Sequence, residues 1–195
     1  LYVVLARKGI LSATQLPSYG EKDSFLEEHP SPHLAGVEAA TGSLGHGLAI
    51  ANGMALAARI QRKAFNVFTL LSDGECNEGS TWEAAMFATR HELNNMCAII
   101  DCNKWQATGR SREVLALDPL ADKWRAFGWV VEEIDGHDHQ QIENKLSAKP
   151  RQLPRMFIAH TIKGKGISFM EDDNNWHYRI PTREEINAAR KELGI

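Results

Sequence analysis

The sequence predicts an α/β domain in which a parallel sheet is flanked by helices. Runs of residues that favour strands occur at 67–71, 96–100, 128–135 and 156–161, and stretches rich in helix-forming residues separate them. Strands that alternate with helices at this rhythm are parallel, because each crossover returns the chain to the same edge of the sheet.

The composition is that of a globular protein with one domain. The chain has 195 residues, of which 43% are hydrophobic and 24% charged, so we expect a single domain over residues 1–195. The net charge of −3 gives no electrostatic basis for binding nucleic acid or an anionic membrane, and no apolar run approaches the length of a membrane span. Three cysteines without a C-x-x-C pattern indicate a reducing, cytoplasmic setting.

The first residues predict the end of a helix. Residues 1–8 are followed by Gly9 as a cap, without an initiating Met or an N-cap, so we expect upstream residues in the natural protein. Ser12 and Gln15 form a capping box for a short helix, and residues 21–41 are an irregular segment. A glycine-rich turn at 42–47 then opens a helix over 48–62, which favours either a ligand seat or a plain tight turn.

The chain is organised around residues 72–103, where the pattern predicts strand, helix and strand. Asp73 follows the first strand and Asn103 follows the second, thirty positions later. Both should lie at the carboxyl edge of the sheet, where open α/β sheets bind ligands. Their oxygens suit Mg²⁺, although Ca²⁺ accepts the same ligands, and Gly74 leaves room for a diphosphate beside the backbone. A D-G pair alone is most often only a turn.

The remaining elements follow the same alternation. Asp118 and Pro119 predict the N-cap and first residue of a helix to 127, and Asp138 caps another helix to about 148. His160 falls inside the last predicted strand, where we interpret it as a core histidine with its hydrogen bonds satisfied. A capping box at Thr182 opens the final helix, which ends at Gly194.

Three segments of the chain resemble the transketolase family. The sequence S-D-G, followed after about thirty residues by N, resembles the thiamine diphosphate motif, with Ser72 in place of the first glycine. The segment H-P…A-G-V-E-A-A-T-G-S-L-G-H-G at 29–47 resembles the family's cofactor loop, with departures at Ser31, Ala35 and His46. The segment T-x-x-G-x-G…H at 161–177 resembles a third family segment. The resemblance implies the thiamine-diphosphate-binding fold.

The resemblance also implies roles for particular residues. Asp73, Asn103 and the backbone carbonyl of Trp105 would hold Mg²⁺ or Ca²⁺. Gly74 and His177 would contact the diphosphate, and His177 would also contact a substrate oxygen. The other implied roles are contacts to the aminopyrimidine (Gly42 and Leu44), to the donor sugar (His29) and across a dimer interface (Glu78 and Glu83). Glu78 and Glu83 could instead simply complement the dipole at the start of their helix.

As a whole, the resemblance predicts the N-terminal subunit of a split transketolase. Such a chain would transfer a two-carbon ketol unit between sugar phosphates together with a C-terminal, pyrimidine-binding subunit, as a dimer of heterodimers. Two alternatives share the motif, namely 1-deoxyxylulose-5-phosphate synthases and the α subunits of 2-oxo-acid dehydrogenases. Further alternatives are a catalytically silent interaction subunit or a nucleotide-binding α/β domain, although no G-x-G-x-x-G follows a strand.

Overall fold

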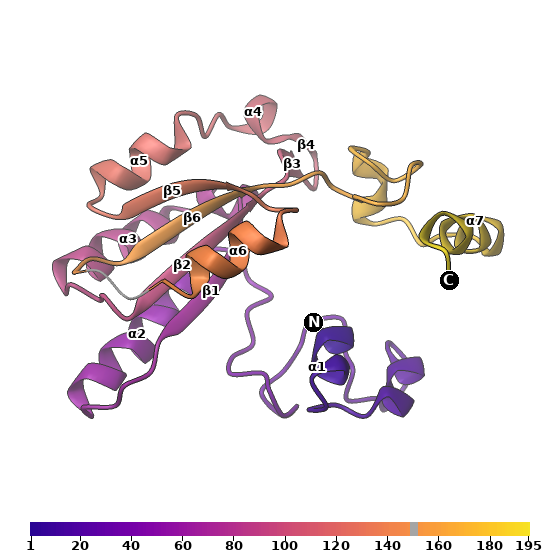
Figure 1. The fold of residues 1–195 in the computed structure, drawn as a ribbon, viewed down its shortest axis with the longest axis horizontal. Coiled ribbons are helices and arrows are strands. Elements are labelled where there is room, and N and C mark those ends of the chain that lie inside the picture. Colours follow the sequence, from indigo (N-terminus) through magenta and orange to yellow (C-terminus); the bar gives the residue numbers. More distant parts are fainter. Residues whose placement is uncertain (149–151) are drawn as a thin grey trace. The chain divides into compact units, whose positions relative to one another are not determined.

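A parallel sheet of four strands is the centre of the computed structural model. Its strands are β1 (Val67–Ser72), β2 (Met96–Cys102), β5 (Val130–Asp135) and β6 (Arg155–His160). Their order across the sheet is β1-β2-β6-β5, and every neighbouring pair is parallel (Figure 1). The prediction of a parallel sheet flanked by helices is therefore confirmed.

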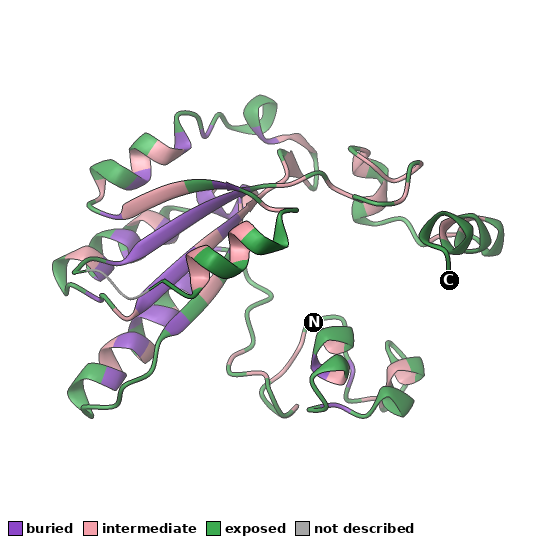
Figure 2. Cartoon of the chain, viewed as in Figure 1, coloured by how far each residue is buried: buried purple, intermediate pink, exposed green. Residues whose placement is uncertain are grey.

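Helices cover both faces of this sheet. Side chains alternate along β2, so Met96 and Ile100 face one core and Cys97 faces the other. The first core includes residues of α2 (Gly47–Ile60), α3 (Gly79–Arg90) and α5 (Leu120–Ala126). The second is covered by α6 (His139–Leu146). The central strands β2 and β6 are accordingly the most continuously buried part of the chain (Figure 2).

The structure describes residues 1–148 and 152–195, which divide into two units, Leu1–His46 and Gly47–Ile195. The sheet belongs to the second unit. The first contains α1 (Tyr2–Arg7) and the 3₁₀ helix η1 (Ala13–Ser18), packed around Leu5, Leu11 and Leu26. The capping box predicted at Ser12 is present and opens η1.

Beyond β6 the chain forms a turn, the 3₁₀ helix η3 (Asn174–His177) and α7 (Arg183–Leu193). The predicted capping box of α7 is present, with Thr182 accepting from the Glu185 amide, and Gly194 ends the helix in the left-handed conformation. No residue of α7 is buried (Figure 2).

One local prediction is wrong, and four short elements were not expected. Asp118 is not the N-cap of α5; Pro119 is, with extended ψ of 102°, and the helix begins one residue later than predicted. Four short elements show no pattern in the sequence that predicts them: η2 (Gly74–Asn77), β3 (Trp105–Gln106), β4 (Gly109–Arg110) and α4 (Ser111–Val114). Within the described residues, every helix is too short or too polar to cross a bilayer.

Candidate functional site

The two halves of the Asp73–Asn103 motif meet at the carboxyl edge of the sheet. The parallel register pairs Ser72 with Asp101, so the residues that follow β1 and β2 emerge side by side. The Asp73 amide donates to the Asp101 carbonyl at 3.2 Å. The Lys104 amide, one residue after Asn103, donates to Asp73 Oδ2 at 3.0 Å. The sheet thus joins two segments that lie thirty residues apart.

Asp73 is a buried carboxylate held by neutral donors. It is 1% exposed, and it accepts from the Gly74 amide at 2.9 Å and from Ser111 Oγ at 2.8 Å, besides the Lys104 amide. Burial raises the pKa of the Asp73 carboxyl above its ordinary value, although these three hydrogen bonds oppose the shift. A carboxylate has about four lone-pair sites, so one stays available for a cation.

Asn103 begins the loop that leads into β3. Its Oδ1 accepts from the Trp105 amide at 2.9 Å, which fixes the amide oxygen relative to the Trp105 backbone. An amide oxygen also keeps a second lone pair for a metal. Among the residues that the structure describes, no three His, Cys, Asp or Glu side chains are grouped as a metal site. A cation here would therefore depend on amide, carbonyl or phosphate oxygens in addition to Asp73.

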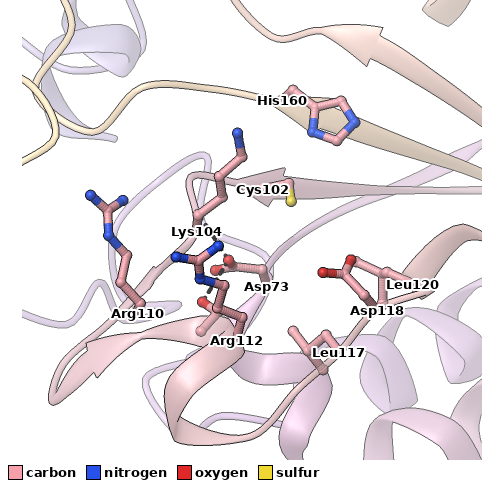
Figure 3. A pocket seen from close by; sticks show the side chains of 10 residues that line it. Asp73, Cys102, Lys104, Arg110, Arg112, Leu117, Asp118, Leu120 and His160 are labelled. Carbon is pink, nitrogen blue, oxygen red and sulfur yellow. Dashed lines mark hydrogen bonds between the residues drawn. The ribbon is translucent and has the colours of Figure 1, made fainter.

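Two cavities flank this edge. One, of about 440 Å³, is lined by Asp73 and Ser111, by basic side chains that include Lys104 and Arg112, and by Asp118 (Figure 3). The other, of about 520 Å³, is lined by Asn103 together with residues of the 161–167 turn. Asp73 thus lines the first of these cavities and Asn103 the second.

The prediction that His160 lies in the core is wrong. His160 is the last residue of β6 and is exposed, because the sheet ends there. Its Nε2 pairs with Glu133 Oε2 at 2.8 Å on the neighbouring strand β5, and it lines the cavity beside Asp73 (Figure 3). His160 stands within a run of strand-forming residues, and that run alone could not show that β6 ends at this histidine.

An ion-pair cluster fixes the β3–β4 hairpin to the segment before η3. Arg110 donates to both carboxylate oxygens of Asp172, at 2.7 and 2.6 Å, and Trp105 Nε1 donates to the same carboxylate at 2.8 Å. The guanidinium also lies over the Trp105 ring, 3.7 Å from its centroid. Asn174 Nδ2 donates to the Ala107 carbonyl at 3.2 Å. No sequence signal marked these partners, which lie more than sixty residues apart.

His177 is the last residue of η3 and is exposed. It packs against Tyr178 with ring centroids 4.6 Å apart. Asp173 caps η3 by accepting from the Asn175 amide at 3.0 Å, so the segment that carries His177 starts beside the Asp172 cluster. The structure thereby connects the His177 segment to the hairpin that follows Asn103, and it shows no direct contact between His177 and Asp73.

The acidic residues of α3 lie on its surface. Glu78 is the N-cap residue of α3 but makes no side-chain cap, and Glu83 is exposed one turn further on. The described structure therefore assigns neither carboxylate a capping role, and both are accessible to a partner.

The residues expected to contact the pyrimidine and the sugar lie in the first unit. His29 and Gly42 come together there, because an ideal Cβ on Gly42 would lie 3.0 Å from His29 Cγ. Leu44 is 54% exposed. Within this unit the His29 ring can lie close to the backbone of residue 42 because glycine has no side chain.

An α/β sheet that brings an Asp-Gly turn and an Asn loop to its carboxyl edge places polar side chains where open α/β domains bind their ligands. Comparison with known proteins then identifies the family. Residues 1–195 match the family described as "Transketolase, thiamine diphosphate binding domain", and the chain belongs to this family. It is a transketolase-family chain of the kind that forms a separate subunit of split transketolases.

Individual relatives agree with this assignment. A subunit of the apulose-4-phosphate transketolase of Phocaeicola vulgatus is 40% identical over 195 residues, which are 99% of this chain and 69% of that protein. A 6-deoxy-6-sulfo-D-fructose transketolase subunit of Clostridium sp. is also 40% identical and is covered to 71%. The solved transketolase of Campylobacter jejuni superposes with a TM-score of 0.88 at 30% identity, over 93% of this chain and 30% of that one. The chain thus spans less than a third of that solved transketolase.

The residues at the sheet edge fit a metal-bound diphosphate. Asp73, Asn103 and the Trp105 carbonyl provide hard oxygens, as Mg²⁺ requires. Gly74 lacks a Cβ at the turn, and a Cβ there would lie 3.1 Å from Gln106 Cγ. Gln106 Nε2 is buried and has no hydrogen-bond partner among the described residues. An unused buried donor beside an Asp-Gly turn is consistent with an anionic ligand at this position.

Proposed function

We propose that this chain is the cofactor-holding half of a two-subunit transketolase that depends on thiamine diphosphate and Mg²⁺. The observation that carries the proposal is the 3.0 Å hydrogen bond from the Lys104 amide to Asp73 Oδ2, because it joins the two halves of the motif. The relatives named as transketolase subunits support the split arrangement. The partner would be a C-terminal, pyrimidine-binding subunit, and the complex a dimer of heterodimers.

Each proposed residue has a defined task, and His177 has two. Asp73, Asn103 and the Trp105 carbonyl would hold the cation, with Ca²⁺ as an alternative to Mg²⁺. Gly74 and His177 would contact the diphosphate. The remaining roles are contacts to the pyrimidine (Gly42 and Leu44), a hydrogen bond to the donor sugar (His29 and His177) and contacts between subunits (Glu78 and Glu83).

Thiamine diphosphate, when bound, supplies the carbon nucleophile and electron sink that cleavage of a carbon–carbon bond requires. The chain's own contribution is to fix the cofactor. Asp73 contributes a buried carboxylate, and Ser111 and the Lys104 amide hold that carboxylate in a fixed orientation. A ligand that is fixed before the cation binds loses little conformational entropy on binding.

We propose a ketose phosphate as donor and an aldose phosphate as acceptor, in the cytoplasm. The names of the relatives, which include an apulose-4-phosphate and a sulfofructose transketolase, support a sugar derivative rather than a 2-oxo acid. The three cysteines are free, which supports a reducing compartment. A panel of ketose phosphates tested against pyruvate separates this function from the synthase and dehydrogenase alternatives.

The first experiment measures thiamine diphosphate binding by calorimetry, with Mg²⁺ or with EDTA, on this chain mixed with its C-terminal partner. Asp73→Ala should weaken Mg²⁺-dependent binding by at least about a hundredfold, since even groups that only orient metal ligands are worth 10–100-fold. Asp122→Ala is the matched control, because Asp122 is an exposed aspartate paired with Arg125 at 2.8 Å. Absence of binding by the wild-type pair would overturn the proposal and favour a catalytically silent chain.

A further inference from the structure

Gln106 has a buried donor that nothing in the described structure uses. Gln106 is the second residue of β3 and pairs with Gly109 of β4 across the hairpin. Its Nε2 is shielded from solvent and has no hydrogen-bond partner among the described residues. A buried N–H without a partner costs free energy, so each such group in a native protein calls for an explanation, of which a catalytic or binding role is one.

The unused donor belongs to a side chain that lies against the turn after β1. An ideal Cβ on Gly74 would be 3.1 Å from Gln106 Cγ and 3.5 Å from Gln106 Cδ. Gly74 therefore gives the Gln106 amide room beside the turn. The preceding residue, Trp105, provides the carbonyl proposed to bind the cation. The unpaired Gln106 Nε2 thus belongs to a side chain that lies beside the Asp73–Gly74 turn and in the loop that follows Asn103.

The hairpin that carries Gln106 is held at both ends. At one end Ser111 donates to Asp73 at 2.8 Å, and the Ser111 amide donates to the Lys104 carbonyl at 3.0 Å. Next to them, Trp105 and Arg110 are fixed by the carboxylate of Asp172. At the other end, the turn, Asn174 Nδ2 donates to the Ala107 carbonyl at 3.2 Å. Because these contacts constrain the backbone on either side of Gln106, its amide is preorganised at the Gly74 turn.

We infer that Gln106 is a further cofactor-binding residue, whose Nε2 donates a hydrogen bond to a phosphate oxygen of the diphosphate. The inference rests on the proposed function and adds a diphosphate-binding residue that the resemblance did not imply. A hydrogen bond to a charged oxygen is worth more than a neutral one, so its loss should weaken diphosphate binding about 10- to 100-fold.

Gln106→Met tests this role, since methionine keeps the length and removes the donor. In the cofactor-free protein its melting temperature should be unchanged or higher, because the variant no longer buries an unpaired polar group. Calorimetry on the two-subunit complex should show weaker binding of thiamine diphosphate with Mg²⁺, and equally weaker binding of inorganic diphosphate with Mg²⁺. Gln106→Glu should bind more weakly still, because a carboxylate repels the ligand. Gln140→Met, at an exposed glutamine of α6, is the control.

The possible outcomes separate this inference from the proposed function. If the wild-type complex binds no thiamine diphosphate, the proposed function fails and the inference with it. If the wild type binds and Gln106→Met binds equally well, only the inference fails. A lower melting temperature with unchanged affinity would likewise overturn it, since Gln106 would then hold a structural water or neighbour. Weaker affinity without loss of stability is the expected result.

Discussion

Two glycines in the turn after β6 allow a stringent test of the structure. Gly164 and Gly166 both have left-handed backbones, with φ of +75° and +98°. At Gly164 an ideal Cβ would lie 2.4 Å from the Met170 carbonyl oxygen and 2.6 Å from its carbon. At Gly166 the nearest atom would be Leu193 Cδ2, at 3.8 Å. Alanine at either position is strained, but only Gly164→Ala also collides with backbone.

Backbone strain and the collision with Met170 together determine how much free energy of unfolding each variant should lose. A left-handed alanine costs about 1–2 kcal/mol, so Gly166→Ala should lower the free energy of unfolding by about that amount. Gly164→Ala adds an overpacking cost of about 1–3 kcal/mol, because the Met170 carbonyl must move. That movement also opposes the hydrogen bonds that close the turn, among them Asp172 N to Lys163 O at 2.9 Å. We therefore expect Gly164→Ala to lose about 2–5 kcal/mol in total.

Urea unfolding followed by circular dichroism measures the global loss for both variants. Hydrogen exchange of residues 161–177 measures the loss if this segment opens while the sheet stays folded. The segment should exchange faster in Gly164→Ala than in Gly166→Ala. Losses that agree within about 0.5 kcal/mol, with equal exchange of the segment, would refute the described path of the 162–173 backbone.

Three further predictions concern other parts of the chain. The thiols should react slowly with iodoacetamide at pH 8 and faster as pH rises, because burial raises the pKa of Cys76 to about 12 and of Cys102 to about 11; mass spectrometry against pH measures this. Trp124→Ala should lower the free energy of unfolding in urea by about 3–5 kcal/mol, because this fully buried ring packs between two other tryptophans. The hydrogen bond from the Thr182 amide lowers the pKa of Glu185 below its ordinary 4.5, so its stabilisation of α7 is present above pH 4.5 and lost as pH falls below it; in Glu185→Gln, helicity should lose this acid dependence.

The sequence predicted the sheet because its signals are local. The strands β1 and β2 are short apolar runs rich in β-formers, and the helix between them consists of good helix formers, so local composition identified them. Composition did not show that β1 lies at the edge of the sheet, where Phe68 and Leu70 are exposed. Parallel pairing then placed Asp73 and Asn103 at one edge without any knowledge of side-chain contacts. The turn after β1 and the loop after β2 could therefore be associated from the printed sequence.

The hairpin after Asn103 could not be predicted in the same way. Its strands have two residues each, too short for a period, and it is stabilised by Asp172, which is 62 residues from Arg110. Ser111 likewise lies 38 residues from Asp73. Contacts of this kind depend on where the turn after β6 folds, and no local pattern in the sequence encodes that. His160 was misassigned for the same reason, because the end of β6 is set by its neighbours.

Three unusual features occur together at one place. Asp73 is a carboxylate buried among neutral donors, Gly74 is a residue without a side chain at a tight contact, and Gln106 has an unpaired buried donor. The buried carboxylate and the unpaired donor cost stability in the ligand-free chain, and a cation with a diphosphate would compensate both. Natural sequences tend to break local rules at functional sites, and the convergence here supports the Gly74 turn as the centre of the cofactor site. The cofactor and Mg²⁺ together should therefore raise the melting temperature of the two-subunit complex more in the wild type than in Gln106→Met.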